Sequence, residues 1–494
     1  MGIIEKQASK STIYIYLGIA IGFLNTLLFP RYLSADQKGI LDAITSASFL
    51  LTSIFTIGLP LLTLRHFPKF RDQQNKNNGF LGFSLLITFV GVIIGLVFLN
   101  YIFKLKVSEQ YQTNFYFSLL FIAFLFRLLF SNLDAIIRMT YNAALGILSS
   151  NLILKLINLT SVILYAIGII DLKMLFIIFV LGLCSPGIIS FIYVLLKRNF
   201  GFSIPSFFRK VKELNLRQDL IKTSIFGFFG SIGGVMVLEI DRIMLLDMMG
   251  TTEVGIYTTA ALFGVVVNVP SRSLRGISGA VISEAWKNND LKTISTVFKK
   301  SSLNLQIISG FLFISILICS PYLFTLMKPE YALGINIIIY IALAQFIDAF
   351  TSVNTEILSS STLYKYQTFF IFLMIGLVVS LNYLLIPIYG IKGAAISTMI
   401  SLSTINIFRT IFIWIKFKIH PFENKNVAVF ILLGAVYCVS FFINEIIELN
   451  PIFKFSLMML FITSIYWFFV LKLRLSEEIN NKVRKVVLLI KEKL

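Results

Sequence analysis

The chain has 494 residues, of which 57% are hydrophobic, 14% aromatic and only 14% charged, and its mean hydropathy is +0.87. Soluble domains are about half apolar and a quarter charged, so this composition excludes an ordinary soluble enzyme. The net charge of +19 raises the question of a nucleic-acid partner, which the distribution of the charges along the chain answers.

Long apolar runs follow one another along the whole chain, and each is near or above the roughly 20 residues that cross a bilayer. The first run carries Asn25 and Pro30 and lacks a small-residue cleavage site, so we expect a retained helix rather than a signal peptide. The sequence therefore predicts an all-α polytopic membrane protein with about 14 transmembrane helices. Their approximate ranges are 12–30, 41–63, 80–103, 115–137, 149–170, 172–196, 222–247, 255–283, 303–326, 332–358, 367–386, 393–416, 427–447 and 451–471.

Lysine and arginine are distributed unevenly over the gaps between these runs. With the N-terminus inside, the inner gaps with their adjoining helix ends and both tails carry 30 of them, and the outer gaps with their adjoining helix ends carry 8. This asymmetry is the one that the positive-inside rule requires, so we expect both termini to be cytoplasmic. Basic inner loops face anionic lipid headgroups, and no nucleic-acid partner is needed to explain the charge.

The longest inner gap divides the chain near its middle. A weak internal similarity crosses it, because residues 33–40 and 249–256 each follow the first helix of their half. We predict an N-terminal six-helix lobe (1–196), a cytoplasmic linker (197–221), a C-terminal six-helix lobe (222–416), an extra helix pair (417–473) and a cytoplasmic tail (474–494). Repeats of this kind build transporters, with the substrate site where the repeats meet.

The tail has a pattern of its own. From Ser476 onward, apolar residues at helical spacing alternate with lysine and arginine. The pattern is typical of an amphipathic helix on the inner membrane face, and a partly ordered basic tail is the alternative.

Ionisable residues inside the predicted spans are the candidates for function, since each costs about 2.5–3.5 kcal/mol to insert at a helix centre. Several fall on single helical stripes with other polar residues. The candidate cavity cations are Arg127, Lys155, Arg272 and Arg275, and the other charges, with coupling or structural roles, are Asp134, Glu239, Asp241, Arg242, Asp348 and Glu356. Cations that face a cavity imply an anionic ligand, and arginine suits phosphate through its planar set of donors.

Structural ion pairs are the competing interpretation of these charges. Asp134 with Arg138, and Glu239 with Arg242, have the spacing of intrahelical pairs. Arg272 and Arg275 share a stripe with Asn268 near Pro270, whose missing N–H favours a bend there. Pairing of these arginines with Glu239 or Asp241 stays open as the alternative to a cavity.

Other chemistry has no sequence signal. The three cysteines lie in apolar runs, which argues against disulfides or a zinc site, and we expect no metal or organic cofactor. His66 and His420 are interpreted as solvated loop residues. HExxH, GxSxG and GxxxxGK[ST] motifs are all missing from the sequence, so energy for transport is expected from a proton or sodium gradient or from a coupled process.

Four stretches resemble the polysaccharide-biosynthesis branch of the multidrug/oligosaccharidyl-lipid/polysaccharide exporter superfamily. The most specific runs from Asn382 to Thr398 and is similar to that family's N-x-L-L-I-P-x-[YF]-G-I-x-G-A-A-I-[AS]-T junction. In it, Pro387 and Gly390 are expected to form a tight outer turn, and Gly393 to allow close packing. The others are Asp241–Leu245 with Glu253–Tyr257, Ser53–Arg65, and Pro329–Ala332.

The resemblance implies a two-lobed, MATE-like fold and a flippase of the Wzx-like or lipid II type. Such a flippase moves an undecaprenyl-pyrophosphate-linked oligosaccharide, the repeat unit of O-antigen, capsule or exopolysaccharide, across the bacterial inner membrane. The family's cationic central cavity suggests Arg65, Arg127 and Arg272 or Arg275 as contacts. Glycan polymerase and assembly machinery are the implied partners.

Two other functions are alternatives to the flippase. A cation-coupled multidrug-type exporter would use Asp348 and Glu356 as coupling carboxylates. A membrane polymerase or ligase would need a large outer catalytic loop, and every predicted outer gap is short. We therefore expect a transporter and not an enzyme.

Overall fold

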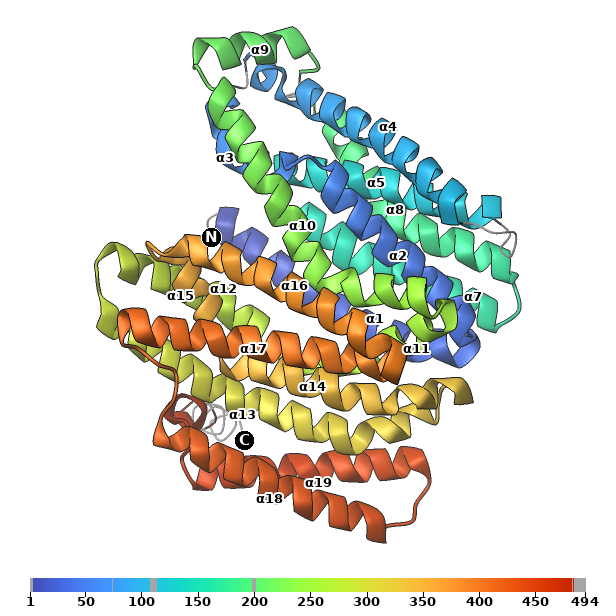
Figure 1. Ribbon diagram of the computed structural model, residues 1–494, viewed down its shortest axis with the longest axis vertical. Helices are drawn as coiled ribbons and strands as arrows, with labels where there is room; N and C mark the ends of the chain where they lie inside the picture. Colours follow the sequence, from blue (N-terminus) through green and yellow to red (C-terminus); the bar gives the residue numbers. More distant parts are fainter. Residues whose placement is uncertain (1–2, 73, 107–112, 198–200, 482, 484–494) are drawn as a thin grey trace, which may run out of the picture. The chain divides into compact units, whose positions relative to one another are not determined.

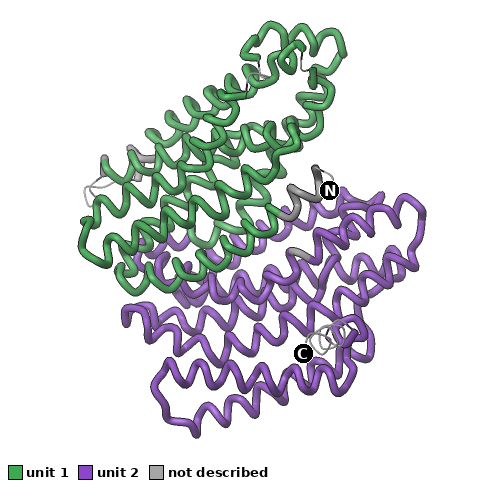
Figure 2. Tube along the Cα trace, turned by 180° about the vertical axis from the view of Figure 1, so that it is seen from behind, with its two compact units in different colours: residues 1–243 green, residues 244–494 purple. Residues whose placement is uncertain are grey.

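The computed structural model describes residues 3–72, 74–106, 113–197, 201–481 and 483. The regular structure of this described part is helical, and fourteen of its helical segments are long and apolar enough to cross a membrane. The predicted all-α class and number of spans are therefore confirmed. The chain divides into two compact units, residues 1–243 and 244–494 (Figure 2).

In its described residues the first unit holds ten α-helices and two short segments of other helical type (Figure 1). The last helix, α10, continues past residue 243, whereas the sequence places the lobe boundary in the gap 197–221; the lobe assignment stays a prediction. The elements are α1 (Ile3–Tyr32), α2 (Ala35–Phe55), α3 (Leu59–Phe70), η1 (Lys76–Gly79), α4 (Phe80–Lys106), α5 (Thr113–Met139), α6 (Ala143–Ile147), the π-helix η2 (Leu148–Ile153), α7 (Leu154–Ala166), α8 (Leu172–Leu196), α9 (Ile204–Glu213) and α10 (Arg217–Met248).

Local signals set the ends of α2. Ser34 caps its N-terminus in a capping box with Gln37. Its C-terminus is followed by Ile57 and Gly58, both with positive φ, so the predicted span 41–63 is wrong beyond Phe55. A Cβ at position 58 would overlap the carbonyl of Ser224, and only glycine lets α3 and α10 approach this closely.

The predicted linker 197–221 contains the amphipathic helix α9. Its Phe207 is buried and stacks on Phe83 with ring centroids 4.0 Å apart, and it also contacts Phe70 and Phe80. Aromatic packing of this kind attaches the segment firmly to the first unit.

The second unit contains nine α-helices and two 3₁₀ segments among its described residues. Residues 35 and 251, which lie in the two similar segments of the sequence, both begin a helix. The elements are α11 (Thr251–Val265), η3 (Val266–Asn268), α12 (Val269–Lys287), α13 (Leu291–Phe324), η4 (Pro329–Gly334), α14 (Ile335–Phe350), α15 (Asn354–Ser360), α16 (Tyr364–Tyr389), α17 (Ile391–Phe417), α18 (Asn424–Ile446) and α19 (Pro451–Lys472).

Two of the predicted spans in this unit are broken. The predicted span 255–283 contains the 3₁₀ segment η3, and Pro270 lies in the first turn of α12, where its missing N–H costs no hydrogen bond; the bend expected there stays a prediction. The predicted span 332–358 stops at Phe350, because Ser352 takes a positive φ of 59° before α15 begins. Non-helical backbone at membrane depth is tolerated only where protein or a watery cavity satisfies its polar groups.

The turn between α16 and α17 confirms part of the expectation for the junction motif. Gly390 has a φ of 60° and forms the turn, whereas Pro387 lies inside the last turn of α16 instead of in the turn itself. A Cβ at position 393 would overlap the carbonyl of Leu385, so Gly393 allows the close packing that was predicted.

Helices α18 and α19 lie side by side and pack on α13 (Figure 1). Buried polar groups join them to α13: Tyr466 donates to the carbonyl of Ile307 (2.8 Å), and Asn426 donates to Gln306 (2.7 Å). After α19 a helical turn covers 477–481, and Ser476 accepts from the N–H of Ile479 (3.3 Å). The rest of the predicted amphipathic tail lies outside the described residues, apart from residue 483.

Candidate functional site

A cluster of polar side chains surrounds Asp348 near the end of α14. Its Oδ2 accepts from Asn268 Nδ2 (2.6 Å) and Arg275 Nη2 (2.9 Å), and its Oδ1 accepts from Asn406 Nδ2 (3.0 Å). Asn268 also donates to Gln345 (2.8 Å). Side chains of η3, α12 and α17 thus converge on one half-buried carboxylate. We call Asn268, Arg275, Gln345, Asp348, Asn406 and Arg409 the Asp348 cluster.

Arg275 of α12 binds the helix end as well as the carboxylate. It donates to the main-chain carbonyls of Asp348 (2.9 Å) and Ser352 (3.2 Å). The last carbonyls of a helix have no intrahelical donor and carry partial negative charge. The guanidinium therefore satisfies the backbone at the break between α14 and α15.

Helix α17 supplies a second layer that the sequence analysis missed. Arg409 donates to Asn406 Oδ1 (3.3 Å) and Thr355 Oγ1 (3.1 Å), and Asn354 donates to Asn406 (3.2 Å). Arg409 lies near the inner end of the predicted span 393–416 and was not among the candidate charges, yet it is only 7% exposed inside α17. The spacing of three between Asn406 and Arg409 within an apolar run was the available signal.

Glu356 lies on α15, beyond the helix break. Its Oε2 is buried and has no hydrogen-bond partner among the described residues. A Cβ at Gly279 of α12 would lie 3.5 Å from its Cγ, so the methylene stem of Glu356 packs against α12. An incompletely bonded buried carboxyl is a group that can take up a proton or a cation.

Arg272 differs from Arg275 although the two share a helical stripe. Its side chain is exposed, and it makes neither a hydrogen bond nor an ion pair with any residue that the structure describes. Arg275 is paired with Asp348 of α14, in its own unit. Of the two arginines, Arg272 is the one whose donors remain available to a ligand.

The predicted cations of the first unit lie on three different helices. The Arg127 guanidinium of α5 stacks on Phe49, with Cζ 3.0 Å from the ring centroid. Lys155 of α7 donates to the carbonyl of Gly18 (2.9 Å) and so joins α7 to α1. Arg65 is exposed on α3. No contact among the described residues joins these three cations.

The intrahelical pairs have the geometry that their spacing predicts. Arg138 lies 2.6 Å from Asp134, and Arg242 lies 2.8 Å from Glu239. Asp241 is buried on α10. Oδ1 of Asp134 is buried without a hydrogen-bond partner in the described part of the chain, and it packs against Gly146, where a Cβ would overlap it.

His66 contradicts its interpretation as a solvated loop residue, whereas His420 is exposed as expected. His66 is 2% exposed on α3, and its Nε2 lies 2.9 Å from Thr223 Oγ1 of α10. Burial lowers the pKa of its imidazole, the charges of Lys69 and Arg65 lower it further, and Asp219 opposes them. Within the described residues, no group of three His, Cys, Asp or Glu side chains is placed to hold a metal ion.

The sequence is similar to that of known proteins. The family described as "Polysaccharide biosynthesis protein" matches residues 6–270, more than half of the chain. An uncharacterized membrane protein of Methanocaldococcus jannaschii is 23% identical over 98% of both chains.

Solved structures share the fold at low sequence identity. The lipid II flippase MurJ in an inward closed conformation superposes with a TM-score of 0.73 at 15% identity, over 93% of this chain and 97% of its own. An inward-facing multidrug MATE transporter superposes with a TM-score of 0.61 at 11% sequence identity, over 85% of this chain and 98% of its own. A transporter of the same superfamily from Pyrococcus furiosus superposes with a TM-score of 0.57 at 13% sequence identity, over 84% of this chain and 95% of its own. The fold is therefore that of this exporter superfamily, as the sequence motifs predicted.

Proposed function

Because the chain belongs to the polysaccharide biosynthesis protein family, we propose that it is a flippase for a lipid-linked oligosaccharide. The substrate would be an undecaprenyl-pyrophosphate-linked repeat unit of a surface glycan, moved from the inner to the outer leaflet by alternating access. The observation that carries this proposal is the family match over residues 6–270. The shared fold with the lipid II flippase MurJ supports it.

The cations of the second unit have separate roles in this proposal. Arg272 contacts the pyrophosphate or an acidic sugar, since its guanidinium is exposed and makes no described ion pair. Arg275 holds the break between α14 and α15 through Asp348 and two carbonyls. Arginine binds phosphate oxygens in pairs through its fork of N–H donors, which lysine does not reproduce.

Complementation tests the translocated substrate. We expect the chain to restore surface glycan in a flippase-deficient bacterial strain whose repeat unit matches, and to leave sensitivity to cationic drugs unchanged. Drug resistance without glycan export would instead identify a multidrug-type exporter. In that alternative function, Glu356 and Asp348 would couple transport to a proton or sodium gradient, and Glu356 is favoured by its unbonded Oε2.

We also propose an orientation with both termini on the cytoplasmic face of a bacterial inner membrane. Single cysteines at the exposed positions Lys173 and Lys392 should react with an impermeant thiol reagent in intact cells. Cysteines at the exposed positions Lys76 and Lys425 should react only after lysis. The exposed native Cys438 must first be replaced by serine. Labelling of position 76 in intact cells would contradict this orientation.

A further inference from the structure

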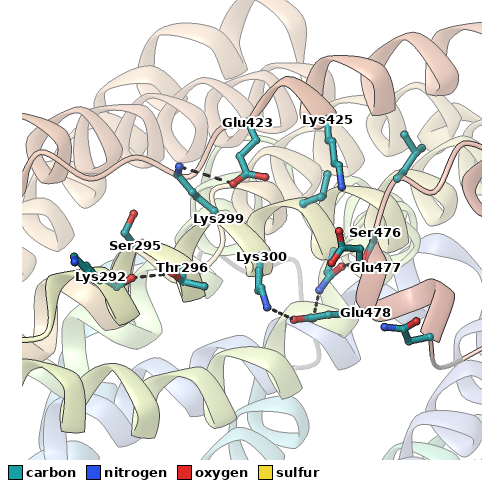
Figure 3. A pocket seen from close by; sticks show the side chains of 14 residues that line it. Lys292, Ser295, Thr296, Lys299, Lys300, Glu423, Lys425, Ser476, Glu477 and Glu478 are labelled. Atoms are coloured by element: carbon teal, nitrogen blue, oxygen red, sulfur yellow. Dashed lines mark hydrogen bonds and ion pairs between the residues drawn. The ribbon is translucent and has the colours of Figure 1, made fainter.

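A cavity of about 680 Å³ opens in the second unit where three helices have their ends (Figure 3). Its walls are the first turns of α13, the segment that leads into α18, and the chain that follows α19. Four lysines and three glutamates line it, together with serine, threonine and asparagine side chains. It lies apart from the Asp348 cluster and shares no residue with it.

Hydrogen bonds and an ion pair hold the segment after α19 against α13 on one side of the cavity. Glu478 accepts from Asn304 Nδ2 (2.7 Å) and lies 3.3 Å from Lys300 Nζ, and Ser476 donates to Asn304 Oδ1 (2.6 Å). Figure 3 shows the contact between Lys300 and Glu478, with Ser476 nearby. These contacts attach the segment after α19 to α13, so this side of the cavity exists before any ligand binds.

The charges that remain favour an anion. Lys299 lies 3.8 Å from Glu423, and Lys300 is paired with Glu478. Lys292 and Lys425 are exposed and form no ion pair with a described residue, and Glu477 is the third lining carboxylate. These two ammonium groups, one from the start of α13 and one from the start of α18, lie in a lining that also holds hydroxyl groups, and together they suit the oxygens of a phosphate group.

The position of the cavity along the helices points to a lipid as the source of that phosphate. Helix α13 has 34 residues and is therefore about 51 Å long, much longer than the roughly 30 Å of bilayer hydrocarbon. A helix of this length has room for its lysine-bearing first turns outside the apolar layer. Helix α18 begins at Asn424 and α19 ends at Lys472, so the cavity lies where two apolar spans have their ends, the level at which lipid headgroups are expected, and Leu303 and Leu475 are among its lining residues.

We propose that this cavity binds the phosphate group of an anionic phospholipid headgroup and thereby ties α13, α18 and the segment after α19 together. Basic pockets between membrane helices bind such headgroups by the same chemistry. The site does not depend on which substrate the protein translocates. A free phosphate from solution offers the same oxygens, and the experiment separates the two sources.

The test measures lipid binding by the full-length purified protein. Native mass spectrometry and thermal unfolding in neutral detergent would be run with phosphatidylglycerol, with phosphatidylcholine, and with inorganic phosphate alone. The cavity variant is Lys292→Gln/Lys425→Gln. The matched control is Lys287→Gln/Lys365→Gln, which removes two exposed lysines of the same unit that do not line the cavity. All four lysines are exposed, so both variants should fold.

We expect phosphatidylglycerol to raise the melting temperature of the wild type and the control, with little effect of phosphatidylcholine. The cavity variant should bind phosphatidylglycerol at least tenfold more weakly. Glu477→Gln, which removes a carboxylate from the lining, should strengthen binding about twofold to threefold. Equal binding by the wild type and the cavity variant, or equal weakening in the control, would overturn the site. Stabilisation by inorganic phosphate as large as that by phosphatidylglycerol would overturn the lipid assignment.

Discussion

Arg275 donates from Nη2 to both the side-chain carboxylate and the main-chain carbonyl of Asp348, and both distances are 2.9 Å. A third bond, to the carbonyl of Ser352, extends the contact across the helix break. The arginine thus satisfies a carboxylate and a helix end together. The backbone contacts distinguish it from a simple ion pair.

Replacing Arg275 with alanine should lower the free energy of unfolding by about 1.5–3 kcal/mol, because the half-buried Asp348 carboxylate loses its charged donor. The swap Arg275→Asp/Asp348→Arg should not restore stability, since an aspartate at position 275 has no donor for the main-chain carbonyls of residues 348 and 352. Chemical unfolding in detergent measures the free energy of unfolding of the single variant and of the swap. Lys210→Ala, in a surface pair with Glu213, is the control and should cost at most about 1 kcal/mol. Full recovery by the swap would show that the carbonyl contacts contribute nothing.

Arg272 should behave differently from its neighbour on the stripe. Because its side chain is exposed and has no described partner, Arg272→Ala should change stability by no more than about 0.5 kcal/mol. If Arg272 contacts the anionic substrate, this variant should lose export at normal membrane abundance, and Arg272→Lys should retain part of it. Complementation with abundance measured in parallel checks both. Normal export by Arg272→Ala would remove this residue from the mechanism.

Glu356 and Asp348 can be separated as coupling candidates by neutral replacements. Glu356→Gln leaves the described hydrogen bonds of the Asp348 cluster intact, whereas Asp348→Asn places an amide against three donors. If Glu356 couples transport, Glu356→Gln should abolish the response of transport to an imposed proton or sodium gradient without loss of thermal stability. Asp348→Asn should mainly destabilise the protein. An unchanged gradient response in Glu356→Gln would contradict the coupling role.

Gly146 is required by the buried carboxyl of Asp134. Gly146→Ala would overlap Oδ1 of Asp134 and should destabilise the protein by about 1–3 kcal/mol. Gly434→Ala on α18 is the matched control, because a Cβ there meets no described atom within 4 Å. That control should be neutral or slightly stabilising, since alanine favours a helix. Equal unfolding curves for the two variants would show that the contact between Asp134 of α5 and Gly146 of α6 can accommodate a methyl group without loss of stability.

The buried His66 should make stability depend on pH. Its pKa is lowered in the folded chain, so the unfolded chain binds more protons just below the ordinary value of 6.5. The free energy of unfolding should therefore fall as the pH drops below about 6.5 and level off below the folded pKa. His66→Gln should flatten this dependence while His420→Gln, at an exposed position, leaves it in place. Thermal unfolding between pH 5 and 8 compares them, and identical slopes in wild type and His66→Gln would refute the assignment.

The sequence by itself determined the class of protein and the number of spans. Apolar runs of bilayer length and the 30-to-8 asymmetry of basic residues are local or additive properties, so they can be read without a fold. Intrahelical pairs such as Glu239 with Arg242 were also predictable, because a spacing of three places them on one helix face. The same holds for Gly393, whose junction motif implied close packing.

Only the tertiary structure decided which charges are engaged. Arg272 and Arg275 share one stripe, yet Arg275 meets Asp348 from a helix 73 residues further on, and Arg272 is exposed. Arg409 and His66 are buried through contacts with distant helices that no local pattern encodes. Periodicity gives the direction of a side chain around its own helix axis. The partner it meets depends on how the helices pack, and that is a property of the whole chain.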